Sequence, residues 1–148
     1  MKNMGGKYWI LGCVGLAGFG LVGCGDGDGS AGESTAEAVE ISVMKDVSVE
    51  EAAAILATDL ELTVLDVRTP EEYGDGHIAG AVNIDYQGDG FREAVAELDR
   101  EGKYLVHCAA GGRSGSSMEV FEELGFTHVY HLADGMMGWE SAGQPIEN

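Results

Sequence analysis

From residue 41 onward, short apolar runs rich in β-branched residues alternate with stretches of helical spacing. This alternation is typical of an α/β domain, in which helices join the strands and cover the sheet. One run, residues 62–67, is apolar on both faces, as in an interior strand. The predicted strands are residues 41–44, 62–67, 81–84, 104–108 and 127–132. We therefore expect a mainly parallel sheet of about five strands, flanked by helices on both faces.

Helix signals fill the intervals between these runs. Ser48 and Glu51 have the spacing of a capping box at the start of a helix over residues 49–57. Thr69 and Glu72 flank a first turn that contains a proline, and glycines soon afterwards keep this second helix short. Apolar spacing predicts three further helices, over residues 91–98, 114–124 and 136–142.

The first 23 residues have the organisation of an export signal. Lys2 and Lys7 precede an apolar stretch over residues 8–20, which is shorter than the ~20 residues that a membrane-spanning helix needs. Residues 21–24, Leu-Val-Gly-Cys, resemble a bacterial lipobox, which implies cleavage before Cys24 and attachment of lipid to its thiol. The alternative is an ordinary signal peptide that happens to end near a cysteine.

Residues 25–35 are glycine, serine and acidic residues with almost no apolar side chains, which indicates a flexible tether. We expect a signal peptide over residues 1–23, a tether over 24–40 and one folded domain over 41–148. The expected location is the cell envelope, with the protein held by lipid on Cys24 at a periplasmic or outer surface. The residue after this cysteine is glycine rather than aspartate, which leaves open whether the membrane is the inner or the outer one.

The chain is strongly acidic, with 26 acidic and 8 basic residues and a net charge of −18. Removal of residues 1–23 leaves 6 basic residues and a net charge of −20. Such a surface repels nucleic acid phosphates and gives no long-range attraction for anionic substrates, although salt screens this effect beyond ~10 Å. The acidity most simply keeps the protein soluble, and we expect a monomer.

Cys108 is the cysteine that remains for chemistry if Cys13 leaves with the signal and Cys24 is lipidated. A lone thiol in an oxidising compartment is a liability unless it has a function, although an inert buried thiol is the alternative. It ends an apolar strand, where open α/β sheets bind ligands, and a glycine-rich loop follows it. Backbone N–H groups of such a loop, the next helix N-terminus and Arg113 would lower the pKa of the thiol from ~8.5. The pattern predicts a thiolate nucleophile.

Four blocks of sequence, in order, resemble the rhodanese family. They are Leu65 to Tyr73 (LDVRTPEEY), Gly76 to Ile84 (GHIAGAVNI), His107 to Ser114 (HCAAGGRS), and Leu132 to Trp139 (LADGMMGW) with Gly143 to Ile146. The resemblance implies a rhodanese-like fold and sulfane-sulfur transfer. Cys108 would take sulfur from thiosulfate or a persulfide, hold it as a persulfide and pass it to a thiol or cyanide, with no cofactor and no metal. The persulfide-binding loop would be Ala109, Ala110, Gly111, Gly112, Arg113 and Ser114.

Alternatives stay open at several positions. Asp66 and Arg68 are interpreted as supporting residues, with a direct catalytic role as the alternative. Asp66 could orient the loop or nearby backbone, and Arg68 could pair with Glu71 or Glu72. Arg113 could line the pocket or brace the loop. The four histidines show no metal-ligand spacing and are assigned core or surface roles.

The alternative function is a non-catalytic sulfur carrier or protein-binding module at the envelope. A phosphatase or oxyanion reductase is disfavoured, because those relatives place five residues between cysteine and arginine and this chain has four. Many single-domain rhodaneses have a basic residue directly after the cysteine, where this chain has Ala109. Thiosulfate binding should therefore be weakened, and a persulfide or polysulfide donor becomes the hypothesis.

Overall fold

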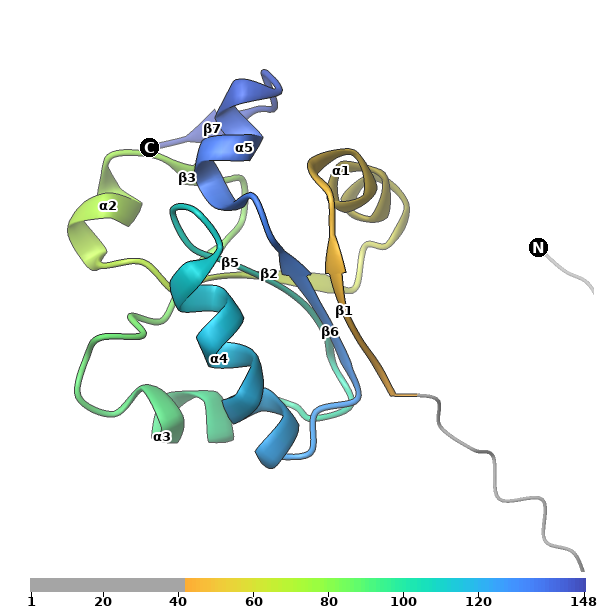
Figure 1. Cartoon of the computed structure of the whole chain (residues 1–148), viewed down its shortest axis with the longest axis vertical. Coiled ribbons are helices and arrows are strands. Elements are labelled where there is room, and N and C mark those ends of the chain that lie inside the picture. Colours follow the sequence, from red (N-terminus) through yellow and green to blue (C-terminus); the bar gives the residue numbers. More distant parts are fainter. Residues whose placement is uncertain (1–41) are drawn as a thin grey trace, which may run out of the picture. The chain divides into compact units, whose positions relative to one another are not determined.

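The computed structural model describes residues 42–148, and its main feature is a five-stranded parallel sheet (Figure 1). The strands are β1 (Val43–Val47), β2 (Leu62–Asp66), β4 (Val82–Asn83), β5 (Lys103–His107) and β6 (His128–Leu132). Their order across the sheet is β1-β6-β5-β2-β4, and every neighbouring pair is parallel. The carboxyl ends of β2, β5 and β6 therefore meet at one edge of the sheet, and the fold class predicted from the sequence is confirmed.

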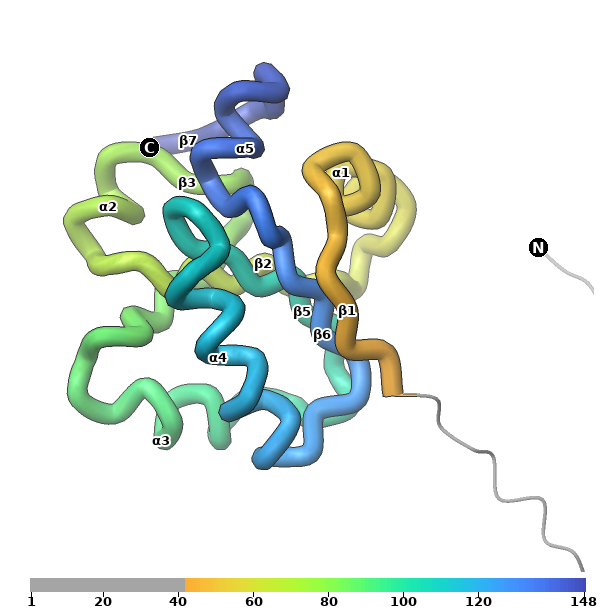
Figure 2. Tube along the Cα trace, viewed as in Figure 1, coloured from red at the N-terminus to blue at the C-terminus, as the bar shows by residue number. Residues whose placement is uncertain are grey.

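Helices cover both faces of this sheet, as Figures 1 and 2 show. They are α1 (Val49–Thr58), α2 (Pro70–Gly74), α3 (Phe91–Ala96), α4 (Gly112–Glu123) and α5 (Gly135–Ser141). Apolar residues of α1 and α5 pack in one cluster with Val64 and Leu105 of the sheet. Apolar residues of α3 and α4 pack in a second cluster with Leu65 and Val106. Consecutive strand residues thus enter opposite clusters, because side chains alternate across a strand.

The predicted helix starts of α1 and α2 are confirmed in detail. The Ser48 side chain accepts from the Glu51 backbone N–H while the Glu51 side chain accepts from the Ser48 N–H, which completes the capping box. Thr69 and Glu72 make the same reciprocal pair at α2, which ends at Gly74 as expected. Each box satisfies backbone donors that a helix start otherwise leaves free.

Several element boundaries differ from the sequence prediction by one to three residues, and one small sheet was not predicted. The first strand begins at Val43 and runs on to Val47, so it was placed too early. Helix α4 begins at Gly112, two residues before the predicted start, because Gly111 adopts a left-handed φ of 82° and turns the chain into the helix. A second, two-stranded antiparallel sheet, β3 (His77–Ile78) with β7 (Ile146–Glu147), was not predicted, because two-residue strands show no periodicity.

The large side chains of the C-terminal segment differ in their burial. Trp139 and Met136 are buried, whereas Met137 is 64% exposed. The predicted signal peptide, Cys24 and the whole of the predicted tether lie outside the described residues. Among residues 42–148, none of the helices is both long and apolar enough to cross a bilayer.

Candidate active site

Cys108 lies directly after β5, at the base of the loop that leads into α4. Its side chain is buried, at 2% exposure, and it packs in the same apolar cluster as Val106 and Phe121. The rim of the loop is more open, since Ala110 and Gly112 are exposed while Ala109 and Arg113 are half-buried. The sulfur therefore sits at the bottom of a short cradle of backbone.

Hydrogen-bond donors converge on the Cys108 sulfur. Burial alone raises the pKa of this thiol, but the Ser114 hydroxyl and the backbone N–H groups of Ser114, Ala110 and Arg113 stabilise the thiolate and bring the pKa below its usual value. The Ser114 Oγ lies 3.4 Å from Sγ. Arg113 and Ser114 are the second and third residues of α4, so their N–H groups have no partner within the helix and are free to point at an anion.

Two glycines allow the loop to pack against the chain that follows β6. A Cβ on Gly111 would overlap the carbonyl oxygen of Ala133, and a Cβ on Gly135 would lie 2.6 Å from the carbonyl oxygen of Cys108. Both residues also have positive φ, 82° and 58°. These positions require glycine for conformation and for close approach at once.

The start of α5 holds the loop from outside. The Met136 N–H donates to the Cys108 carbonyl at 2.8 Å, and the Met137 N–H donates to the Ala109 carbonyl at 2.9 Å. These two carbonyl groups therefore accept hydrogen bonds from α5, on the side away from the sulfur. The side of the loop that faces the sulfur carries the N–H donors.

Arg113 braces the loop against helix α2. Its two terminal nitrogens each donate to a carboxylate oxygen of Glu72 at 2.7 Å, a bidentate pair. The hydrogen bond from Arg113 holds the pKa of Glu72 down at about 2, against a smaller opposing effect of burial. Both interpretations of Arg113 have support, because its pKa is raised by the hydrogen bond to Glu72 and, to a smaller extent, by an interaction with the Cys108 side chain. Glu72 is a site residue that the sequence indicated only as a helix cap and as a possible partner of Arg68.

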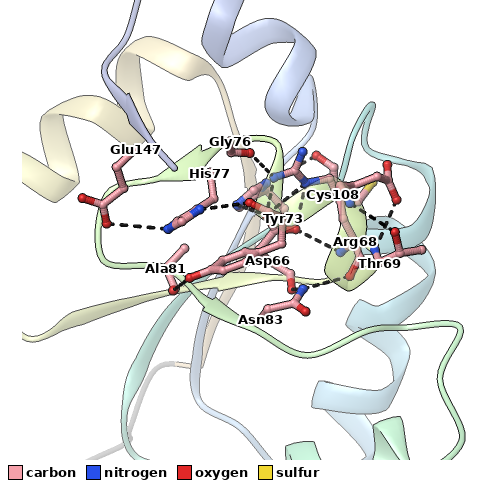
Figure 3. A network of polar contacts seen from close by, with 12 residues as sticks. Asp66, Arg68, Thr69, Tyr73, Gly76, His77, Ala81, Asn83, Cys108 and Glu147 are labelled. Atoms are coloured by element: carbon pink, nitrogen blue, oxygen red, sulfur yellow. Dashed lines mark hydrogen bonds and ion pairs between the residues drawn. The ribbon is translucent and has the colours of Figure 1, made fainter.

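Asp66 and Arg68 form a buried ion pair beside the loop (Figure 3). The Arg68 side chain donates to both carboxylate oxygens of Asp66 and to the carbonyl of Gly76, and Asp66 also accepts from the Arg68 backbone N–H. Asn83 donates to the carbonyls of Asp66 and Arg68. The expected pairing of Arg68 with Glu71 or Glu72 is therefore wrong, because Asp66 is nearer and Glu72 is occupied by Arg113.

The same network continues to the small second sheet, as Figure 3 shows. The rings of Tyr73 and His77 are stacked with centroids 3.8 Å apart, and the Tyr73 hydroxyl donates to the Ala81 carbonyl. His77 lies 3.7 Å from Glu147 of β7. These contacts join α2 to the chain terminus and support a scaffold role for His77.

The two remaining buried histidines differ in their surroundings. Burial lowers the pKa of His107, and its Nε2 has no hydrogen-bond partner among the described residues. His131, by contrast, contacts Ser114 at 2.9 Å and Asp46 at 2.7 Å. His131 was not predicted to be a neighbour of the cysteine. It lies on the same buried face of β6 as Val129, two residues earlier, and a buried imidazole requires a polar partner.

The structure thus brings together Cys108, the predicted loop residues 109–114 and the Asp66–Arg68 pair at one edge of the sheet. Cys24 lies outside the described residues. Within residues 42–148, no group of three or more histidine, cysteine or acidic side chains is arranged to hold a metal ion.

This fold, with a cysteine at the base of a four-residue loop closed by an arginine, defines a class of protein. Residues 48–142 match the family described as Rhodanese-like domain, so the chain belongs to the rhodanese-like domain family.

Relatives and solved structures agree with this assignment. The chain is 42% identical over 65 residues to the thiosulfate sulfurtransferase PspE of Escherichia coli strain K12, covering 44% of this chain and 62% of that protein. It is 34% identical over 102 residues to the putative sulfurtransferase YtwF of Bacillus subtilis, covering 69% and 96%. A crystal structure of a rhodanese-related protein from Thermoplasma volcanium superposes with a TM-score of 0.61 at 32% identity, covering 70% of this chain and 98% of that one.

Proposed function

We propose that this protein is a sulfurtransferase that carries a sulfane sulfur as a persulfide on Cys108. The observation that carries the proposal is the convergence of the Ser114 hydroxyl and three backbone N–H groups on the buried Cys108 sulfur. Such fixed donors stabilise a thiolate before the reaction and a persulfide anion after it, as an oxyanion hole stabilises its charge.

The reaction needs no group beyond the thiol and its donors. The Cys108 thiolate attacks the outer sulfur of the donor, the S–S bond of the donor breaks, and the departing sulfite or thiolate keeps the bonding electron pair. A thiol or cyanide then attacks the outer sulfur of the Cys108 persulfide, and the Cys108 thiolate leaves with its electron pair. The cycle begins and ends with the same thiolate.

The charges around the loop favour an organic persulfide over thiosulfate as the donor. Arg113 is bound by Glu72 in a bidentate pair, and Arg68 is bound by Asp66. Ala109, at the half-buried rim of the loop, supplies no positive charge. A dianion such as thiosulfate therefore meets N–H dipoles and arginines that are already paired with carboxylates, whereas the persulfide group of an organic donor carries at most a single negative charge.

The test is the mass of the Cys108 peptide after the full chain is exposed to thiosulfate or to glutathione persulfide. We expect a gain of one sulfur atom that cyanide removes, with faster loading from the persulfide. Cys108→Ser should show no gain, and the matched control Cys24→Ser should load Cys108 normally. If no donor gives an adduct, the protein is a non-catalytic module; if thiosulfate loads Cys108 far faster, the donor assignment is wrong.

We also propose that the protein acts at the cell envelope, anchored by lipid on Cys24 and separated from the membrane by the tether over residues 25–35. The lipobox-like residues 21–24 and the short apolar stretch before them support this proposal. Metabolic labelling with a fatty acid analogue tests it. The parent chain should incorporate the label and sediment with membranes, and Cys24→Ser should do neither.

A further inference from the structure

A line of polar side chains leads from the Cys108 sulfur to the first strand of the sheet. The Ser114 Oγ lies 3.4 Å from the Cys108 Sγ and 2.9 Å from the His131 Nε2. The other ring nitrogen of His131, Nδ1, lies 2.7 Å from a carboxylate oxygen of Asp46. Ser114 and His131 are buried, whereas the Asp46 side chain is 77% exposed. The line therefore connects a buried thiol to the protein surface.

The fold fixes the members of this line relative to one another. Asp46 and His131 are directly paired in the register of β1 and β6, so their side chains project on the same face of the sheet. Helix α4 passes over this face at Gly115, where a Cβ would lie 3.4 Å from the His131 ring. A glycine in the first turns of α4 thus leaves room for the imidazole beside Ser114.

The Ser114 hydroxyl has one hydrogen and three acceptors within reach, the Cys108 Sγ, the Gly111 carbonyl oxygen and the His131 Nε2, and one assignment of the hydrogens links Cys108 to His131. A carboxylate only accepts hydrogen bonds, so the contact with Asp46 places a hydrogen on Nδ1 of His131. In the neutral ring Nε2 is then an acceptor, and it takes the single hydroxyl hydrogen of Ser114. In the neutral thiol form the S–H of Cys108 donates to the Ser114 oxygen, which is the reverse of the thiolate form, in which the Ser114 hydroxyl donates to the sulfur. The result is a continuous path, S–H to Oγ–H to Nε2.

Moving one proton along each step of this path ionises the thiol without leaving a charge on the serine. The S–H bond breaks and its electron pair stays on sulfur, Ser114 gains that proton as it gives its own to Nε2, and His131 becomes an imidazolium. The Ser114 hydroxyl now donates to the thiolate. The Nε2–H can donate to Ser114 Oγ or to the Gly111 carbonyl oxygen, which is 3.2 Å from Nε2.

The charged groups around His131 are mostly acidic. It lines a surface cleft of about 780 Å³, and the charged groups that line this cleft are Lys45 and Asp46 from β1 and Glu119 and Glu122 from α4. The paired position on β5 is the apolar Val106. Three carboxylates against one ammonium give the cleft a net negative charge, and the cleft also gives the ring a route for proton exchange with solvent.

We propose that His131, oriented by Asp46 and acting through the Ser114 hydroxyl, is the proton acceptor for the Cys108 thiol. The inference deepens the proposed sulfur transfer and rests on it only for its use in a catalytic cycle. His131 touches no substrate and is a positioning residue. Its role is to keep Cys108 as a thiolate paired with an imidazolium before the donor arrives, while protons exchange through the cleft lined by Asp46 and not through the mouth of the loop.

The test is the pH dependence of alkylation of Cys108 by iodoacetamide, a neutral reagent that reacts with thiolates. The full chain is used and the reaction is followed on the Cys108 peptide by mass spectrometry. At about pH 6, His131→Gln should lower the rate roughly tenfold, equivalent to a rise of about one unit in the pKa of the thiol, and at about pH 10 the rates should converge because the thiol is ionised in both proteins.

Two further variants separate the relay from a structural effect. His128→Gln removes the neighbouring half-buried histidine of β6, which contacts Thr127 and not Ser114, and it should leave the profile unchanged. Asp46→Asn changes a side chain that is 77% exposed, and it should lower the rate at about pH 6 by roughly twofold to threefold. A His131→Gln profile that overlies that of the parent would overturn the proposal. So would an equal change at both pH values, which indicates altered access.

Alkylation requires no sulfur donor, so this result is independent of the proposed function. If the pH profile shifts in His131→Gln but no donor loads Cys108, the proton relay is supported and the sulfurtransferase proposal is contradicted. If a donor loads Cys108 but the profile is unchanged, the sulfurtransferase proposal is supported and the relay is contradicted.

Discussion

Arg113 and Glu72 face each other across a bidentate ion pair in which both N–O distances are 2.7 Å, and this pair joins the cysteine loop to helix α2. The arginine that closes the loop in sequence is therefore occupied by a carboxylate of this chain. Arg113 holds the loop in shape through this pair, and its side chain also interacts with Cys108.

Loss of the Glu72 carboxylate should remove an acid-sensitive part of the stability. Because Arg113 holds the pKa of Glu72 at about 2, below its unfolded value, the pair contributes stability above about pH 4.5 that is lost as the pH falls towards 2. Glu72→Gln keeps an acceptor for the Thr69 cap and should cost about 0.5–1 kcal/mol at neutral pH, since the Glu72 side chain is 35% exposed.

Denaturant unfolding at pH 7 and at about pH 3 measures this difference. The matched control is Glu51→Gln, at the same position of the capping box of α1. A Glu72→Gln chain whose deficit is as large at about pH 3 as at pH 7 would contradict the assigned cause.

Asp66→Asn should be strongly destabilising. The Asp66 carboxylate is fully buried and Arg68 nearly so, and removing one charge leaves the other unpaired in the interior. We expect a loss of about 3–5 kcal/mol in the free energy of unfolding. Asp59→Asn breaks the more exposed pair with Lys103 and should cost under about 1 kcal/mol. Chemical denaturation measures both losses. Similar losses in the two variants would show that burial of an ion pair does not determine the free energy lost when it is broken.

Gly111→Ala should disrupt the loop, whereas Gly112→Ala should be tolerated. The added methyl group at Gly111 overlaps the Ala133 carbonyl and the residue has a φ of 82°, while a Cβ on Gly112 meets no atom within 4 Å. We expect Gly111→Ala to cost about 2–4 kcal/mol and to reduce sulfur loading. Thermal unfolding together with the loading assay tests the pair. Equal effects of the two substitutions would mean that the contact with Ala133 is not limiting.

A positive charge at position 109 should improve the use of thiosulfate. Ala109→Lys places an ammonium at the rim of the loop, where an attraction of about 1 kcal/mol corresponds to about a fivefold gain in kcat/KM for the dianion. Turnover of glutathione persulfide should change less. Steady-state rates with both donors, at two salt concentrations, measure the effect. A gain that is equal for the two donors, or one that salt does not reduce, would exclude charge as the reason.

The sequence predicted the layer structure of the domain well, because its strands and helix caps are local signals. Strand β2 is recognisable from five residues, and the capping box at Ser48 from four. Cys108 and the loop to Arg113 are contiguous, so their meeting at the carboxyl edge follows from the order of elements along the chain.

The contacts that join distant segments were not predictable in the same way. Arg113 meets Glu72 across 41 positions of sequence, and His131 meets Asp46 across 85. The second contact depends on the register of β1 with β6, and the first strand was placed too early, which would have turned Asp46 into a loop residue. Arg68 was given the wrong partner because its choice among three carboxylates depends on side-chain direction, which spacing along the chain does not determine.

Cys108 is the one cysteine among the described residues, and it is buried at the base of its loop. A persulfide formed there has no second thiol within residues 42–148 to react with, so it cannot form a disulfide inside this part of the chain. Its lifetime then depends on how often an external nucleophile reaches the mouth of the loop. The domain would behave as a store that holds one sulfur atom and releases it on encounter with an acceptor.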